Sequence, residues 1–275
     1  GLRALVAGVL ITISQPLIYL FIRASDKSGQ EILDLITRQK TLDVLALTLL
    51  LLLIVVLVNV FLGTAIAAGL HYVKIPYPRI LLVSTILPLA IPSYVFTYTW
   101  MAIFPGLEGV WAAAFILSLS TMPYMILAVT ISFQRIDSGL IEVARSLGLS
   151  KPAVFTRVIL PQVRRSISAG ALLAALYTIS DFGAVSLLNV ETLTVTIQNM
   201  YKASYDRSAA AVISFVLIAF STIVVLADEK IKRQTPGSSV VKVYSTKNSL
   251  INNAWMRFAV ITTIGIYAIN AVVIP

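Results

Sequence analysis

The chain has 275 residues, of which 58% are hydrophobic and 12% are charged, and its mean hydropathy is +0.92. A soluble globule of this size needs more polar surface, so the composition excludes a water-soluble protein and indicates one embedded in a lipid bilayer. The formal net charge of +9 is spread over short connections between apolar runs, which fits orientation in a membrane and argues against nucleic-acid binding.

Six apolar runs are long enough to cross about 30 Å of hydrocarbon, which takes roughly 20 helical residues. In chain order they cover residues 2–22, 42–70, 79–104, 110–133, 162–190 and 209–227. None alternates apolar and polar residues with a period of two, so helices are predicted rather than barrel strands. The predicted fold is an all-α, multi-pass membrane protein with six transmembrane helices in residues 1–228.

A polar segment at residues 229–254, with the stretch TPGSS inside it, is predicted to be a flexible cytoplasmic linker. A further apolar run begins near Trp255 and continues through residues 255–275. This order predicts that the run is the first helix of a second half of similar design, so that the sequence covers part of a longer polypeptide.

Basic residues are concentrated in alternate connections, and the richest is residues 134–166, here called the charged loop. It contains Arg135, Arg145, Lys151, Arg157, Arg164 and Arg165. The positive-inside rule therefore places the charged loop and the amino terminus in the cytoplasm.

The charged loop is predicted to form two short helices. Apolar residues at helical spacing predict an amphipathic helix over 138–147, and Gly148 supplies the left-handed position that ends many helices. Ser150 is a predicted N-cap for a second helix from Lys151 to about Val158. Val154, Phe155 and Val158 would form an apolar knob for a partner, and Pro161 would break the helix where the chain re-enters the membrane. An ordinary solvated loop is the alternative.

Residues 142–161 of this loop read EVARSLGLSKPAVFTRVILP. The pattern E-x-A-x-x-x-G followed by V-x-L-P resembles the EAA signature of permease subunits of binding-protein-dependent ABC importers. Val143 and Val158 replace an alanine and an isoleucine of that signature; the positions in register are Glu142, Ala144, Gly148, Leu160 and Pro161. The resemblance implies a type I importer fold in which Glu142, Ala144 and Gly148 shape the turn. It also implies contact with an ATPase through Ser150, Lys151, Val154, Phe155 and Arg157.

Three further stretches look like permeases of the ferric-iron importer family, with thiamine permeases as close relatives. They are LPLAIPSYVFTY (87–98), LYTISDFGAVSLL (176–188) and YDRSAAA (205–211). The resemblance implies a bacterial inner-membrane protein that works with a second permease half, fused or separate. It also implies a periplasmic or lipoprotein substrate-binding protein and an ATPase dimer that binds the ATP and Mg²⁺.

Asp181 is the one carboxylate well inside an apolar run, where a charge costs at least about 2.5 kcal/mol. With Tyr177, Ser180 and Gly183 it is a candidate lining of the translocation pathway, because Fe³⁺ accepts carboxylate and phenolate oxygens. The alternative is that Asp181 lies near the outer interface and caps a helix break at Phe182. Pro92 and Tyr94 complete the candidate pathway set. Pro88 and Pro92 predict a kink, which is either part of a gate or a static bend. For Tyr94, the alternative to lining the pathway is a place in the belt of aromatic residues at the membrane interface.

Other function classes fit less well. The sequence has no G-x-x-x-x-G-K-[ST] pattern, so ATP hydrolysis is predicted to belong to a separate subunit and the chain itself is not an enzyme. With no cysteine and one histidine, no metal site is assigned and a catalytic dyad is hard to build. A secondary transporter without an ATPase remains the alternative from another class, although Asp181 alone is a poor coupling pathway.

Overall fold

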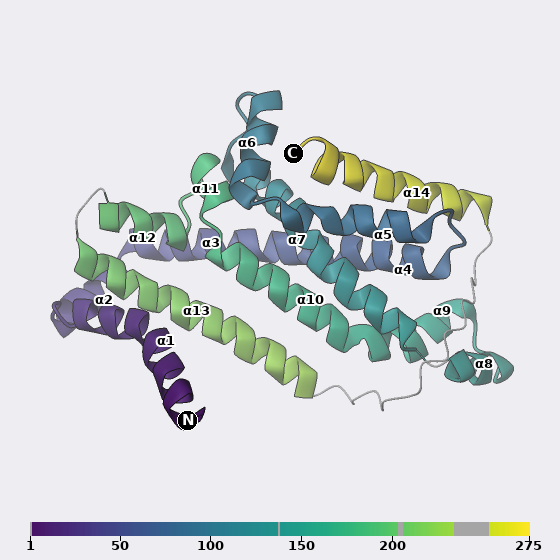
Figure 1. Ribbon diagram of the computed structural model, residues 1–275, viewed down its shortest axis with the longest axis horizontal. Helices are drawn as coiled ribbons and strands as arrows, with labels where there is room; N and C mark the ends of the chain where they lie inside the picture. Colours follow the sequence, from purple (N-terminus) through teal and green to yellow (C-terminus); the bar gives the residue numbers. More distant parts are fainter. Residues whose placement is uncertain (1, 137, 203–205, 234–252) are drawn as a thin grey trace.

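The computed structural model describes residues 2–136, 138–202, 206–233 and 253–275, and every regular element among them is a helix. The predicted all-α fold is confirmed. Long helices run roughly side by side, with α8 (Ser138–Ser146) and α9 (Lys151–Val154) at one end of the bundle (Figure 1). We call this the loop end. The amphipathic helices α2 (Gly29–Thr37) and α12 (Leu193–Lys202), which the apolar runs did not predict, lie at the opposite, far end.

The first two predicted runs both form helices, and the second of them reaches from the far end toward the loop end (Figure 1). α1 (Leu2–Ala24) covers the first run. α3 (Gln39–Val58) passes through a π-helical turn, η1 (Asn59–Gly63), into α4 (Thr64–Tyr72), and together they make one apolar helix of 34 residues. The buried amide of Asn59 donates a hydrogen bond to Thr121 at 2.6 Å, so the wide turn also ties this helix to the centre of the bundle.

The third predicted run is not one straight span. α5 (Pro78–Ile86) and the 3₁₀ turn η2 (Leu87–Ala90) meet α6 (Ser93–Ile103) at a bend of 98°. Ile91 is extended because the ring of Pro92 disfavours a helical conformation in the residue before it. The predicted kink is confirmed, and it is sharp enough to turn α6 out of the bundle direction (Figure 1).

α7 (Gly109–Gln134) is the centre of the bundle. Of its most apolar stretch 72% is buried, against 33% or less for the other three helices apolar enough to span a membrane. Ala112, Ala113 and Ala114 are all buried, and these small side chains let neighbouring helices approach closely. α7 packs against α3, α4, α5, α6 and α10, so it is the element that positions both candidate sites.

The prediction that residues 162–190 form a single transmembrane span is wrong. α10 (Leu160–Ser180) ends at Asp181, and a separate short helix, α11 (Gly183–Leu187), follows. The described residues hold four helices long and apolar enough to cross a membrane, or five if the bent pair counts as one. α10 is not among them because Gln162, Arg164 and Arg165 make its first turns polar.

The last described helices are α13 (Arg207–Arg233) and α14 (Ala254–Ala268), which ends in a π-helical turn, η4 (Ile269–Val273). Of the predicted linker, residues 229–233 continue α13 and 234–252 lie outside the described residues. α14 packs on the first bundle: Val260 fits against Gly69, and the Tyr267 hydroxyl donates to the Leu119 carbonyl at 3.1 Å. α14, which is predicted to begin a second half, thus packs against the helices of the first half.

Candidate functional site

The first helix of the charged loop ends as its sequence predicts. Gly148 has φ +83°, in the left-handed region that glycine adopts without steric cost. The amide of Leu149 donates to the Ala144 carbonyl at 3.1 Å, and the amide of Gly148 donates to the Arg145 carbonyl at 3.0 Å. These two bonds make a Schellman motif, which satisfies the last carbonyls of α8 and reverses the chain toward α9.

The second helix of the charged loop continues into the bundle. The Ser150 carbonyl accepts the first helical bond, from Val154, at the predicted start of α9. α9 then passes through a π-helical turn, η3 (Phe155–Ile159), into α10. The predicted break at Pro161 is wrong, because Pro161 lies in the first turn of α10 after a wide turn that accommodates its missing amide hydrogen. α9, η3 and α10 form one uninterrupted helical rod from the charged loop to Asp181.

One face of the charged loop is anchored in the bundle. Ala144 and Val154 are 5% and 4% exposed, and they share an apolar cluster with Phe133 and Val163. The prediction that Val154 belongs to a knob for a partner is therefore wrong. Val154 faces inward because α9 turns its face toward α7 and α10, a fact of tertiary packing that helical spacing alone does not reveal.

A neighbouring stripe of α8 is apolar and exposed, while its far face carries the polar residues Glu142, Arg145 and Ser146. Leu140, Val143 and Leu147 are 50%, 59% and 78% exposed, and with Phe155 at 37% they form what we call the docking surface. Glu142, Ser150 and Arg157 are also exposed, as are Leu160 and Pro161 nearer the bundle. The Lys151 side chain lies outside the described part of the structure. Sequence reasoning missed Val143 as a surface residue, although the spacing of 140, 143 and 147 marks a second helical stripe.

The second candidate site lies where α10 ends. Asp181 is 7% exposed, and its Oδ1 accepts a hydrogen bond from the Ala184 amide at 2.9 Å. The carboxylate therefore caps α11, which is the alternative stated from the sequence. The Asp181 carbonyl also accepts a bond from the Thr194 hydroxyl at 2.8 Å, so the break is held from both sides.

Most of the predicted pathway residues gather at this break. Ser93, at the start of α6, is a side-chain hydrogen-bond partner of both Tyr177 and Asp181. A Cβ built on Gly183 would come within 3.1 Å of the Tyr94 backbone nitrogen, so α11 and α6 approach closely at a residue without a side chain. Sequence reasoning missed Ser93, whose place next to Pro92 at the kink was the available signal.

Three pathway candidates make no polar side-chain contact across the break. The Ser180 hydroxyl bonds back to the Tyr177 carbonyl at 3.1 Å, and Pro92 is an exposed helix start. Tyr94 is 53% exposed, with its backbone against Gly183. Among the described residues, no group of three or more His, Asp or Glu side chains could hold a metal ion.

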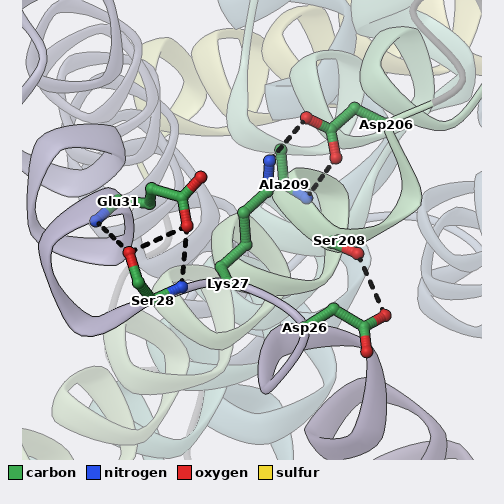
Figure 2. Close-up of polar contacts among 7 residues, drawn as sticks. All are labelled: Asp26, Lys27, Ser28, Glu31, Asp206, Ser208 and Ala209. Atoms are coloured by element: carbon green, nitrogen blue, oxygen red, sulfur yellow. Dashed lines mark hydrogen bonds and ion pairs between the residues drawn. The ribbon is translucent and has the colours of Figure 1, made fainter.

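At the far end, the connection between α1 and α2 is fastened to the start of α13. Lys27 Nζ lies 3.0 Å from Asp206 Oδ2, and the Ser208 hydroxyl donates to Asp26 at 3.3 Å (Figure 2). Asp206 also accepts from the Ala209 amide at 2.9 Å, which caps α13. This backbone bond, followed by the bond from Lys27, holds the pKa of Asp206 below its ordinary value.

The chain is similar in sequence and in fold to known transport proteins. Residues 60–235 match the family described as binding-protein-dependent transport system inner membrane component. The chain is 31% identical to an Fe(3+)-transport system permease protein of Haemophilus influenzae, over 99% of the chain and 55% of that protein. It is 26% identical to a chloroplastic sulfate permease of Chlamydomonas reinhardtii, over 87% of the chain and 70% of that protein. The chain thus spans about half the length of the Haemophilus relative.

A shorter match is to a spermidine/putrescine transport system permease of Escherichia coli, at 30% identity over 35% of the chain and 38% of that protein. Among solved structures, a chain of a bacterial alginate ABC transporter, crystallised with an alginate pentasaccharide-bound periplasmic protein, aligns with a TM-score of 0.65. That alignment covers 86% of this chain and 96% of the other at 14% identity. At this identity the likeness concerns the fold.

Proposed function

Because the chain belongs to the family of binding-protein-dependent transport system inner membrane components, we propose that it imports ferric iron by ATP-driven alternating access. In this proposal a binding protein delivers the iron at the far end, and the charged loop faces the cytoplasm. A separate ATPase dimer binds ATP and Mg²⁺ and docks at the loop end. A second permease half completes the translocation pathway.

The observation that carries the coupling role is the two-sided construction of the charged loop. Its docking surface exposes Leu140, Val143, Leu147 and Phe155, while the adjoining residues Ala144 and Val154 anchor the loop in the bundle. An exposed apolar stripe on a short helix, flanked by charges, suits a groove on a protein partner. An ordinary solvated loop would not need both the anchor and the stripe.

The uninterrupted rod from α9 through η3 to α10 supports the mechanism. A displacement of α9 by a closing ATPase would be carried along α10, because a hydrogen-bonded helix resists compression and bending over its length. The rod ends at Asp181, where Ser93 joins it to the kink of α6. The proposed stroke therefore reaches the bend at Pro92, which would open and close the pathway.

The choice of ferric iron is supported by the Haemophilus permease, whose match covers almost the whole chain. Sulfate and spermidine/putrescine permeases are also similar, and they define the competing substrates. Thiamine remains the alternative that the sequence resemblance raised. Tyr177, Asp181 and Ser93 offer oxygen atoms, which favour a hard cation over an anion such as sulfate.

The docking role is tested with paired substitutions in the charged loop. Leu147→Asp should abolish most binding of the cognate ATPase, because it places a charge in the apolar docking surface, and should leave thermal stability unchanged. Val154→Ala should instead lower stability, since it opens a cavity in the anchor. Co-purification and thermal melting measure the two effects, and retention of the ATPase by Leu147→Asp would contradict the docking role.

The substrate is tested in proteoliposomes that contain the full-length permease with its ATPase and binding protein. Radiolabelled ferric iron should accumulate in an ATP-dependent manner, and labelled sulfate, spermidine and thiamine should not. Accumulation of another of these solutes would replace iron as the substrate. Uptake without ATP would favour a secondary transporter.

A further inference from the structure

A second buried carboxylate lies near the loop end of α13. Asp228 is 8% exposed, and with Asp181 it makes up the buried acidic residues of the described chain. Asp181 is accounted for as the cap of α11. Asp228 lies inside α13, away from the first turn where a carboxylate would stabilise the helix dipole, so capping does not explain it.

The contacts of Asp228 join α13 to α10. The Ser168 hydroxyl of α10 donates to Asp228 Oδ1, and Lys232 Nζ lies 2.5 Å from Asp228 Oδ2. One helical turn away on α10, the Arg165 guanidinium donates to the Lys232 carbonyl at 3.3 Å. These groups form a polar clamp between two helices that otherwise pack through apolar side chains such as Ala175 and Phe220.

A buried charge is costly, and a well-packed apolar residue at the same place is often as stabilising. The adjacent pair of Glu229 and Arg233 shows the ordinary alternative, because it has the same spacing on α13 and is exposed. Stability alone therefore gives no reason to bury Asp228 against Ser168. A fixed register between α10 and α13 does give one, since hydrogen-bonded charges hold a single geometry more strictly than apolar contacts.

α10 connects the clamp to the charged loop, and α13 connects it to the far end of the bundle. α10 continues without interruption from the charged loop, and α13 runs from the clamp to the far end, where Asp206 is joined to Lys27 (Figures 1 and 2). We propose that Asp228 is a positioning residue that makes α10 and α13 move as one body, so that the stroke received at the docking surface reaches the far end. This inference rests on the proposed ATP-driven function.

The test uses the full transporter in proteoliposomes and measures solute transported per ATP hydrolysed. Asp228→Asn keeps the size of the side chain and removes its charge. It should lower the transport-to-hydrolysis ratio by about tenfold, the order expected from weakening a charge-assisted hydrogen bond, while ATPase binding stays intact. Glu229→Gln, the matched control on the exposed face, should leave the ratio unchanged. An unchanged ratio in Asp228→Asn would overturn the proposal.

A double-mutant cycle with Ser168→Ala separates this role from simple destabilisation. If both residues act through one contact, the double variant should transport per ATP no worse than Asp228→Asn alone, and multiplied losses would overturn the proposal. Thermal melting of each variant accompanies the cycle. A ratio that falls only in proportion to the folded fraction would also reject the positioning role. Absence of ATP-dependent uptake in the wild type would instead reject the proposed function.

Discussion

At the scale of single residues, conformation and burial decide which side chains can act at a site. Gly148 reverses the chain because its backbone adopts a positive φ, and Asp181 is held as a cap because an amide of α11 lies within reach. Val154 and Phe155 are neighbours in sequence, yet one anchors the charged loop and the other is exposed on it. Each of these roles can be tested by one substitution.

Gly148→Ala should weaken the turn by about 1–2 kcal/mol, the cost of a left-handed conformation in a residue with a Cβ. No atom lies within 4 Å of a Cβ built at this position, so the cost comes from the backbone and not from a clash. Hydrogen exchange of the α8 amides should report the opening. Gly29→Ala is the control because that site is equally open and has no positive φ, and equal protection in both variants would contradict the prediction.

Asp206 combines a helix cap with an ion pair, and two substitutions separate them. Asp206→Asn keeps a good cap and loses the pair with Lys27, which at 42% exposure contributes at most about 0.5 kcal/mol. Asp206→Ala loses both and should cost about 1 kcal/mol more. Thermal melting in detergent at neutral pH measures the two losses, and equal melting of the two variants would contradict the assigned cap.

The pH dependence of the Asp206 pair follows from its lowered pKa. The ionised carboxylate, held first by the Ala209 amide and then by Lys27, stabilises the folded state fully above the unfolded pKa of about 3.9, and this contribution is lost as the pH falls through the lower pKa of the folded state. The melting temperatures of wild type and Asp206→Asn should therefore converge in acid. A difference that persists below that range would mean that the charge of Asp206 is not its source.

At the scale of elements, close packing around α7 sets the positions of the other helices. Met125 of α7 is fully buried, and both Gly63 and Gly170 pack against it without a side chain of their own. α10 therefore approaches the α7 backbone closely enough to share the anchor of the charged loop. This contact holds α10, which would carry the proposed stroke, closely against α7.

Gly170→Ala should disturb that approach. Its Cβ would lie 2.9 Å from the Met125 Cα, a backbone atom that cannot move aside, so α10 must shift at a cost of about 1–3 kcal/mol. Gly265→Ala on α14 is the control, because nothing lies within 4 Å of its Cβ. Thermal melting compares the two, and similar stability in both would mean that α7 and α10 tolerate a wider spacing.

At the scale of the whole molecule, the two ends of the bundle differ in chemistry. The loop end presents the basic charged loop and the docking surface, whereas the far end carries the ion pairs of Lys27 with Asp206 and of Lys40 with Glu191. From the positive-inside rule we expect the basic end of this bundle to face the cytoplasm. α13 connects the two ends, which is why its register with α10 concerns the entire bundle.

The orientation is tested with single cysteines, which are informative because the chain has none of its own. Ser146→Cys on α8 should react with an impermeant maleimide only in inside-out vesicles. Gln30→Cys on α2 should react from the outside of spheroplasts; both positions are exposed. The reverse pattern would place the docking surface outside the cell and remove the basis for ATPase coupling.

The sequence by itself determined the all-helical membrane class, the positions of most long helices and the turn at Gly148. These follow from apolar composition and from local conformational preference, which a chain carries in every context. The EAA-like pattern also located the charged loop. The Pro88 and Pro92 pair located the kink, because proline acts on its immediate neighbours.

Only the tertiary structure decided which face of each helix is covered. Val154 is buried and Val143 is exposed because α9 and α8 pack in a particular direction on α7 and α10, and apolar spacing is equally consistent with either face. The continuity past Pro161 depends on a wide turn that no local signal announces. The clamp of Asp228 with Ser168 joins residues 60 positions apart, and such pairings exist only once the helices have come together.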